Sequence, residues 1–292
     1  MVNKDSIVLT ARKKFHQELV SCGLLSFVGK DGIASNADRT NKPSCAIAKL
    51  IGDRLGAKKG CKLSPQKTGK YFESAIFQLV QDTFPKLQHL RPGKWDILRL
   101  GNKNAVKTSN FAQYEHLAHL AKVLKSDRTL ETMLGNDYIV APDIVVSREL
   151  CDDAEINAGA CFVDKNVCLK TDIRKSNGGQ PLLHASISAK WTMRSDRSQN
   201  SRTEALNLIR NRKGHLPHIV VVTGEPLPSR LASLALGTGD IDCVYHFALY
   251  ELLDAVKEYG KDGREDIIEQ LESLIDGRRL KDISDLPLDL TC

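Results

Sequence analysis

The hydrophobic periodicity of this 292-residue chain changes about a third of the way along. In the first part, apolar side chains recur every three or four positions, which is typical of amphipathic helices. In the remainder, short β-branched runs alternate with helical segments. The helices predicted in the first part are Ser6–Leu19, Cys45–Leu55, Tyr71–Val80 and Phe111–Leu124, with Ser44 and Thr68 as N-caps of the second and third.

The second part predicts a sheet whose strands are connected through helices. Strands and helices in alternation give an α/β or α+β class. The predicted strands are Tyr138–Val146, His184–Trp191, His218–Thr223 and Asp242–His246. The predicted helices are Gln199–Asn211, with Ser198 as its cap, Ser229–Leu236, Ala248–Tyr259 and Glu265–Ile275.

Composition excludes several classes of protein. Apolar residues make up 41% of the chain, and its length can bury a core without disulfide bonds. No apolar run approaches the roughly 18 residues of a membrane span, and the N-terminus is too short in apolar residues for a signal peptide, which predicts a cytoplasmic protein without a membrane partner. The eight cysteines form no CxxC pair, so we expect no zinc site. The net charge of +6 permits a polyanionic partner without requiring one.

Asp143 stands after Pro142 inside an apolar run, although Asp is depleted in strands. A buried carboxylate is costly unless it is paired or binds a metal. The alternative is an Asp that caps a turn at the end of the strand. In His184–Trp191, polar and apolar residues alternate, so Ser188 and Lys190 share one face. A solvent-exposed sheet face would give the same pattern.

The combination of Asp143, Lys190 and Glu204 favours phosphodiester hydrolysis. That chemistry needs carboxylates to hold Mg²⁺ against phosphate oxygens and a cation near the attacking water. Glu73 lies between aromatic and apolar residues and fits either an exposed helix position or an active-site acid. Nucleotide-binding glycine loops and a G-x-S-x-G elbow are absent from the sequence.

Arg194-Ser195-Asp196-Arg197 precedes a predicted helix. Arg donates to guanine O6 and N7, and a carboxylate accepts from cytosine N4, so this segment suits the reading of G·C pairs in a major groove. A solvated, charge-balanced helix start is the alternative. The basic run Arg210–Gly214 suits either phosphate contacts or the negative end of the helix dipole.

Pro142-Asp143 followed by Ser188-Ala189-Lys190 resembles the PD-(D/E)XK nuclease signature, with Ser188 where the second acid usually stands. In one subgroup of type II restriction endonucleases the acid comes from the following helix, as Glu204 does here, and an Arg-Ser-Asp-Arg segment reads CCGG. Nearly the whole chain resembles a member of this subgroup that cuts GCCGGC. The resemblance is weaker around Lys49–Lys62 and Gly260–Asp276.

The resemblance implies a restriction-endonuclease-like fold with a central mixed β-sheet flanked by helices. It implies one endonuclease domain over residues 1–292, whose helical N-terminal third packs on the catalytic core. Mg²⁺ would be the cofactor, with two ions in each active site. Asp143, Glu204 and the Ala189 carbonyl would hold the metal, Lys190 would orient the attacking water, and Ser188 and Glu73 would complete the site.

The resemblance also assigns the DNA contacts. Arg194, Asp196 and Arg197, with Ser195 between them, would read the central CCGG. The outer G·C pair would be contacted by Asp38, Gln66 and Arg230.

The predicted function is Mg²⁺-dependent cleavage of both strands of double-stranded DNA at a GCCGGC-type palindrome by a metal-activated water. A palindrome calls for a homodimer, and the resemblance implies a homotetramer. The alternative is a catalytically silent, sequence-specific DNA-binding protein. A methyltransferase is a third possibility, disfavoured because no glycine-rich cofactor loop follows a strand.

Overall fold

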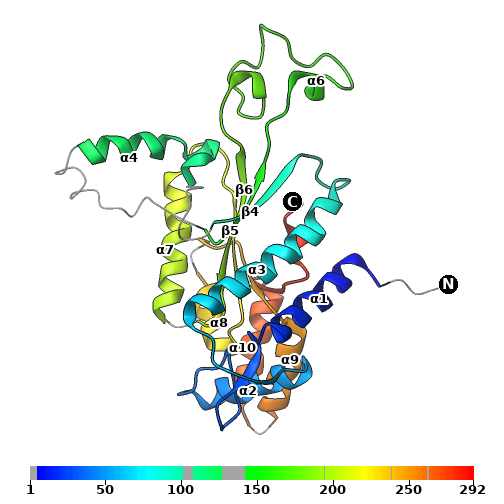
Figure 1. Ribbon diagram of the computed structural model, residues 1–292, viewed down its shortest axis with the longest axis vertical. Helices are drawn as coiled ribbons and strands as arrows, with labels where there is room; N and C mark the ends of the chain where they lie inside the picture. The colour runs from blue at the N-terminus through cyan, green and yellow to red at the C-terminus, as the bar shows by residue number, and fades with distance from the viewer. Residues whose placement is uncertain (1–4, 101–107, 127–141, 194, 238, 262) are drawn as a thin grey trace.

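A mixed sheet lies at the centre of the computed structural model, which describes residues 5–100, 108–126, 142–193, 195–237, 239–261 and 263–292 (Figure 1). Within these ranges its six strands follow the order β4-β5-β6-β7-β8-β9. The neighbouring pairs β4–β5 and β5–β6 are antiparallel, and the pairs from β6 to β9 are parallel. The predicted mixed α/β sheet flanked by helices is confirmed. The strands are β4 Trp95–Arg99, β5 Ile144–Arg148, β6 Leu182–Lys190, β7 His218–Thr223, β8 Cys243–His246 and β9 Leu280–Asp282.

Helices cover both faces of β6, including its polar face. Trp191, just beyond the strand, packs edge-to-face on Phe72 of helix α3 (Pro65–Thr83), with ring centroids 5.0 Å apart. Ser186 and Ser188 are only 3% and 8% exposed, and Ser188 donates a hydrogen bond to Glu204 of helix α7 (Ser195–Asn211). The alternative of a solvent-exposed sheet face is therefore wrong, because these polar side chains are buried.

Four of the eight predicted helices, now α2 (Lys42–Arg54), α3, α7 and α8 (Pro228–Ala235), begin earlier than predicted. Asn41 caps α2 and Ser64 caps α3 by accepting from backbone N–H groups three residues ahead, so the predictions of Ser44 and Thr68 as caps are wrong. In both helices Pro occupies the first turn, where its missing N–H costs nothing. The helices are α1 Ile7–Ser21, α2 Lys42–Arg54, α3 Pro65–Thr83, α4 His116–Ser126, α6 Asp153–Ile156, α7 Ser195–Asn211, α8 Pro228–Ala235, α9 Leu249–Gly260, α10 Glu265–Asp276 and α11 Leu286–Asp289.

A small second sheet lies within the first third of the chain, which we predicted to be helical. It consists of β1 Ser26–Val28, β2 Ile33–Ala34 and β3 Lys58–Gly60, in the order β2-β1-β3. A Cβ at Gly60 would lie 2.8 Å from the Ser26 Cβ, so glycine permits the close approach of β3 to β1. Strands of two or three residues are too short for hydrophobic alternation to reveal them.

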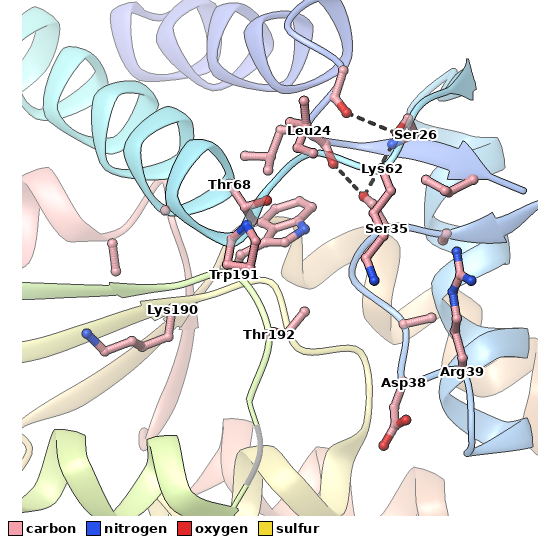
Figure 2. Close-up of a pocket in the computed structure, with 18 of the residues that line it drawn as sticks. Leu24, Ser26, Ser35, Asp38, Arg39, Lys62, Thr68, Lys190, Trp191 and Thr192 are labelled. Atoms are coloured by element: carbon pink, nitrogen blue, oxygen red, sulfur yellow. Dashed lines mark hydrogen bonds between the residues drawn. The ribbon is translucent and has the colours of Figure 1, made fainter.

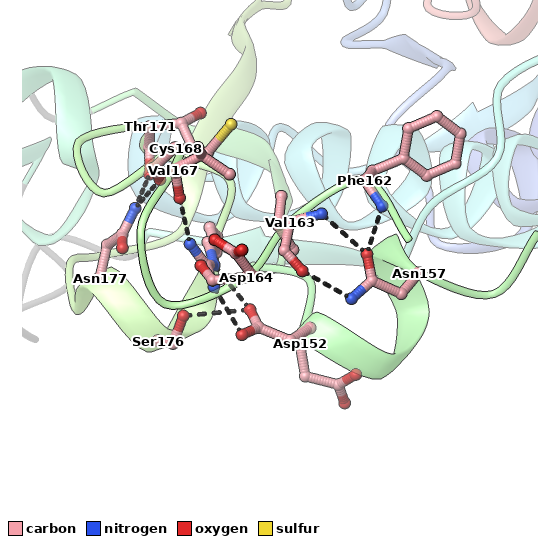
Figure 3. A network of polar contacts seen from close by, with 12 residues as sticks. Asp152, Asn157, Phe162, Val163, Asp164, Val167, Cys168, Thr171, Ser176 and Asn177 are labelled. Atoms are coloured by element: carbon pink, nitrogen blue, oxygen red, sulfur yellow. Dashed lines mark hydrogen bonds and ion pairs between the residues drawn. The ribbon is translucent and has the colours of Figure 1, made fainter. Parts of the chain in front are cut away.

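Between β5 and β6 the chain forms an arm, residues 149–181, that extends away from the sheet (Figure 1). Arg174, only 3% exposed, pairs with both oxygens of Asp153 at 2.7 Å and donates to the carbonyls of Asp164 and Val167 (Figure 3). Phe162 on the arm remains 67% exposed. A polar network therefore organises the arm.

The predicted strand at Tyr138–Val146 begins in the structure at Ile144, and residues 138–141 lie outside the described ranges. The predicted helix at Phe111–Leu124 is divided into 3-10 turns and α4. No helix that the structure describes is long and apolar enough to cross a membrane.

Candidate active site

Asp143 lies directly before β5 and beside the end of β6. The antiparallel register pairs Ile144 with Ile187, which places the Asp143 side chain next to Ala189 and Lys190. Its Oδ2 accepts a hydrogen bond from the Ala189 N–H at 2.7 Å and another from the Lys190 ammonium at 3.1 Å. The carboxylate is thus fixed by one backbone and one side-chain donor at the carboxyl end of β6.

Glu204 reaches the same end of the sheet from α7. The Ser188 hydroxyl donates to Glu204 Oε2 at 3.3 Å, so two neighbouring β6 residues contact two different acids. Burial raises the pKa of Glu204, and the negative charge of Asp143 raises it further, while Lys190 and the Ser188 hydrogen bond oppose the shift. The carboxylate therefore lacks full charge compensation from the protein.

Glu73 approaches from α3. Its Oε2 lies 3.9 Å from an Arg99 Nη, and the side chain is 22% exposed. Burial raises the pKa of Glu73, with a further contribution from Asp143, while Arg99 and Lys190 oppose the shift. The prediction left Glu73 open between surface and site, and the structure brings it within electrostatic reach of Asp143. We call Glu73, Asp143 and Glu204, with Lys190, the acidic cluster.

The donor set of the acidic cluster fits a hard divalent cation. Carboxylate and carbonyl oxygens are the ligands that Mg²⁺ prefers, and Mg²⁺ commonly uses only one or two protein carboxylates together with water and substrate phosphates. Within the described ranges no group of three or more His, Cys, Asp or Glu side chains is close enough to form a complete metal site. Asp143, Glu204 and the Ala189 carbonyl match the open kind of site, which DNA phosphates would complete.

A cleft of about 500 Å³ leads away from the acidic cluster, between β6 and the N-terminal part of the chain (Figure 2). Lys190 and Glu204 line this cleft together with residues from the N-terminal part of the sequence. Arg39 and Lys62 bring positive charge to it, and Trp191 and Thr192 follow β6 along it. Positive charge near a candidate phosphodiester site favours a polyanionic substrate.

Asp38, also in the lining of the cleft, forms an ion pair with Arg230 of α8. That pair holds the pKa of the Asp38 carboxyl well below its usual range. Arg230 Nη1 lies 3.7 Å from Glu225 Oε2 and donates to the Met193 carbonyl at 3.1 Å. We call Asp38, Glu225 and Arg230 the arginine cluster. Three residues were predicted to contact the outer G·C pair, and the structure brings two of them, Asp38 and Arg230, into direct contact.

Gln66 is the third residue predicted to contact the outer G·C pair. It is exposed at the second position of α3, between the cleft residues Pro65 and Thr68. Sequence reasoning missed Glu225, which is 1% exposed. Its signal was available, because Gly224-Glu225-Pro226 follows the apolar run His218–Thr223 much as Asp143 accompanies another apolar run.

The predicted CCGG reader lies at the start of α7. Arg194 is outside the described residues, and Ser195-Asp196-Arg197 form the first turn of the helix. The predicted start near Gln199 is therefore wrong, and Ser198 is a buried residue within the helix. Hydroxyl and acidic residue types are compatible with a first turn, where backbone N–H groups are free and the helix dipole favours negative charge. In the sequence, three residues, Trp191–Met193, thus separate Lys190 of the acidic cluster from the segment predicted to read CCGG.

Comparison with known proteins identifies the family of the chain. A solved complex of restriction endonuclease PspGI with substrate DNA is 13% identical, with 97% of this chain and 91% of that chain covered and a TM-score of 0.27. The type II restriction enzyme NgoMIV of Neisseria gonorrhoeae is 49% identical over 280 residues, which are 96% of each chain. The family model described as NgoMIV restriction enzyme matches residues 15–292. The chain therefore belongs to the NgoMIV restriction enzyme family and is a type II restriction endonuclease.

Proposed function

We propose that this endonuclease requires Mg²⁺ and cuts both strands of double-stranded DNA at the palindrome GCCGGC. One observation carries the catalytic assignment. Three successive residues of β6 contact the two acids, since Ser188 donates to Glu204 while Ala189 and Lys190 donate to Asp143. Two carboxylates and an ammonium at one strand end are the groups that metal-assisted phosphodiester hydrolysis requires.

Asp143, Glu204 and the Ala189 carbonyl would hold the metal, with two ions in each site. Divalent cations supply Lewis-acid polarisation of the phosphate there. Lys190 orients the attacking water and offsets negative charge that develops on the phosphate. Ser188 holds Glu204 in place through its hydrogen bond, and Glu73 adds a third carboxylate at the edge of the cluster.

The start of α7 would read the central bases. Arg194, Asp196 and Arg197 supply donors for guanine and an acceptor for cytosine, and the N-terminus of a helix is the part that most often meets base edges. The relative at 49% identity is a type II restriction enzyme, which supports a site-specific reading of DNA by this chain. Asp38, Gln66 and Arg230 would contact the outer G·C pair. A two-fold palindrome requires a homodimer, and we propose that two dimers form a homotetramer.

Digestion of a plasmid that carries a single GCCGGC site tests this function. We expect one linear product with Mg²⁺ and none with EDTA, and sequencing of the ends should place both cuts within the site. A matched plasmid in which only the outer pair is changed, to ACCGGT, should remain intact. Absence of cleavage in Mg²⁺ would favour the silent DNA-binding alternative, and cuts outside GCCGGC would contradict the proposed sequence.

A further inference from the structure

Glu225 is a buried carboxylate to which the reaction assigns no task. It follows β7 at the Gly224-Glu225-Pro226 turn and is 1% exposed. Burial raises the pKa of Glu225 to about 7, although the Met193 N–H and Arg230 both favour the charged form. A carboxylate in such a position is costly to keep, so its contacts reveal what it does.

Both oxygens of Glu225 accept hydrogen bonds from the backbone. Oε2 accepts from the Met193 N–H at 2.9 Å and lies 3.7 Å from Arg230 Nη1, while Oε1 accepts from the Leu227 N–H at 3.2 Å. Arg230 also donates to the Met193 carbonyl at 3.1 Å. Met193 is the residue before Arg194, and Leu227 is the N-cap residue of α8. One carboxylate thus connects the approach to α7 with the beginning of α8.

The backbone next to Glu225 is closely packed against neighbouring segments, so the position of Glu225 is coupled to theirs. A Cβ at Gly224 would lie 2.7 Å from the Trp191 carbonyl oxygen, so only glycine permits the turn to lie against residue 191. Asn36 donates to the Gly224 carbonyl at 2.8 Å and belongs to the same segment as Asp38. Residues from three separate parts of the chain therefore meet around Glu225.

We propose that Glu225 is a positioning residue for sequence reading, which orients Arg230 together with its partner Asp38. This inference rests on the proposed reading of GCCGGC and deepens it. Glu225 itself touches no base. It acts by holding Arg230 in the orientation from which its guanidinium meets the outer base pair.

Equilibrium binding to short duplexes in EDTA, where no strand is cut, tests the proposal. The quantity measured is the Kd for ACCGGT divided by the Kd for GCCGGC, which reports discrimination at the outer pair. Glu225→Gln retains the shape of the side chain but loses its charge, and we expect this ratio to fall about tenfold. Discrimination against a changed central CCGG should be retained.

A double-mutant cycle separates positioning from general stability. If Glu225 acts through Arg230, the double variant of Glu225→Gln and Arg230→Ala should discriminate no worse than Arg230→Ala alone. Glu251→Gln is the matched control, because it also neutralises a partly buried acid paired with an arginine, Arg12, away from the cleft. It should leave the ratio unchanged.

The outcomes are distinguishable. If the wild-type protein does not prefer GCCGGC, both the proposed site and this inference are wrong. A wild-type preference that Glu225→Gln leaves intact, or additive effects in the cycle, would overturn the role of Glu225 alone. Should the Gln variant fail to fold by circular dichroism, Glu225→Asp, which keeps the charge but withdraws it from Arg230, provides the same comparison.

Discussion

The acidic cluster and the arginine cluster both place carboxylates beside the ends of sheet strands, but they differ in how charge is balanced. In the acidic cluster, burial and mutual repulsion raise the pKa of Glu73 and of Glu204. In the arginine cluster, Arg230 lowers the pKa of Asp38 and approaches Glu225. In the first cluster three carboxylates share one ammonium, that of Lys190, whereas in the second two carboxylates share one guanidinium, so the first retains more negative charge for a cation to neutralise. Substitutions should therefore affect the two clusters differently.

The largest effect is expected from Lys190→Ala in the acidic cluster. Loss of the ammonium that contacts Asp143 should reduce the single-turnover cleavage rate at least about a hundredfold, because developing charge on the phosphate is no longer offset. Binding to GCCGGC should be retained. Lys257→Ala, which removes an exposed lysine paired with Glu272, is the control. Undiminished cleavage by Lys190→Ala would exclude Lys190 from the catalytic machinery.

The next effect is expected from Arg230→Ala in the arginine cluster. Discrimination at the outer base pair should fall by about 1–3 kcal/mol, the value of one good arginine–guanine contact. Competition binding between GCCGGC and ACCGGT measures this change. Arg54→Ala, which breaks a peripheral ion pair with Glu258, should leave discrimination unaltered. An equal loss of discrimination at the central CCGG would show that Arg230 supports the whole interface.

A smaller effect of opposite sign in the two clusters should appear in the stability of the metal-free protein. Glu204→Gln relieves repulsion with Asp143 and should raise the free energy of unfolding by about 0.5–1 kcal/mol. Asp38→Asn weakens a charge-assisted contact with Arg230 and should lower it by about 1–2 kcal/mol. Urea denaturation in EDTA measures both values. Changes of the same sign would contradict the comparison.

The smallest effect is the dependence of these differences on pH. The pKa of Glu204 in the folded state lies above its ordinary value of 4.5. The folded protein therefore binds extra protons and loses stability as pH rises from 4.5 through the folded-state pKa. The pKa of Asp38 lies below 3.8, so its contribution is complete above 3.8 and is lost as pH falls further. The Glu204→Gln advantage should therefore shrink as pH falls toward 4.5 and be absent below it, whereas the Asp38→Asn deficit should begin to shrink only below pH 3.8.

Sequence alone predicted the parts of this molecule that have strong local patterns. The run His218–Thr223 forms β7 with the predicted bounds, because six largely apolar residues between turns have few alternatives. Asp143 and Lys190 stood out because charged residues within apolar strands are costly unless paired, and the structure pairs them. Each of these residues alone also fitted a structural role, and only their combination with Glu204 indicated a site.

Sequence could not predict features that depend on the meeting of distant segments. Glu225 and Met193 lie 32 positions apart, and their hydrogen bond follows only from the parallel register in which Lys190 is paired with Thr223. The β1–β3 sheet likewise joins strands on both sides of α2. Local propensity carries no information about either contact.

The short segment Trp191–Met193 has a consequence for how specificity can change. On the proposed roles, these three residues are all that separates Lys190 at the cut phosphate from Arg194 among the read bases. A chain spans at most about 3.6 Å per residue, so this separation is limited to a few base-pair steps. Substitutions in the first turn of α7 could then alter the sequence that is read without displacing the cut, whereas insertion of one residue before Arg194 would move the cut relative to the site.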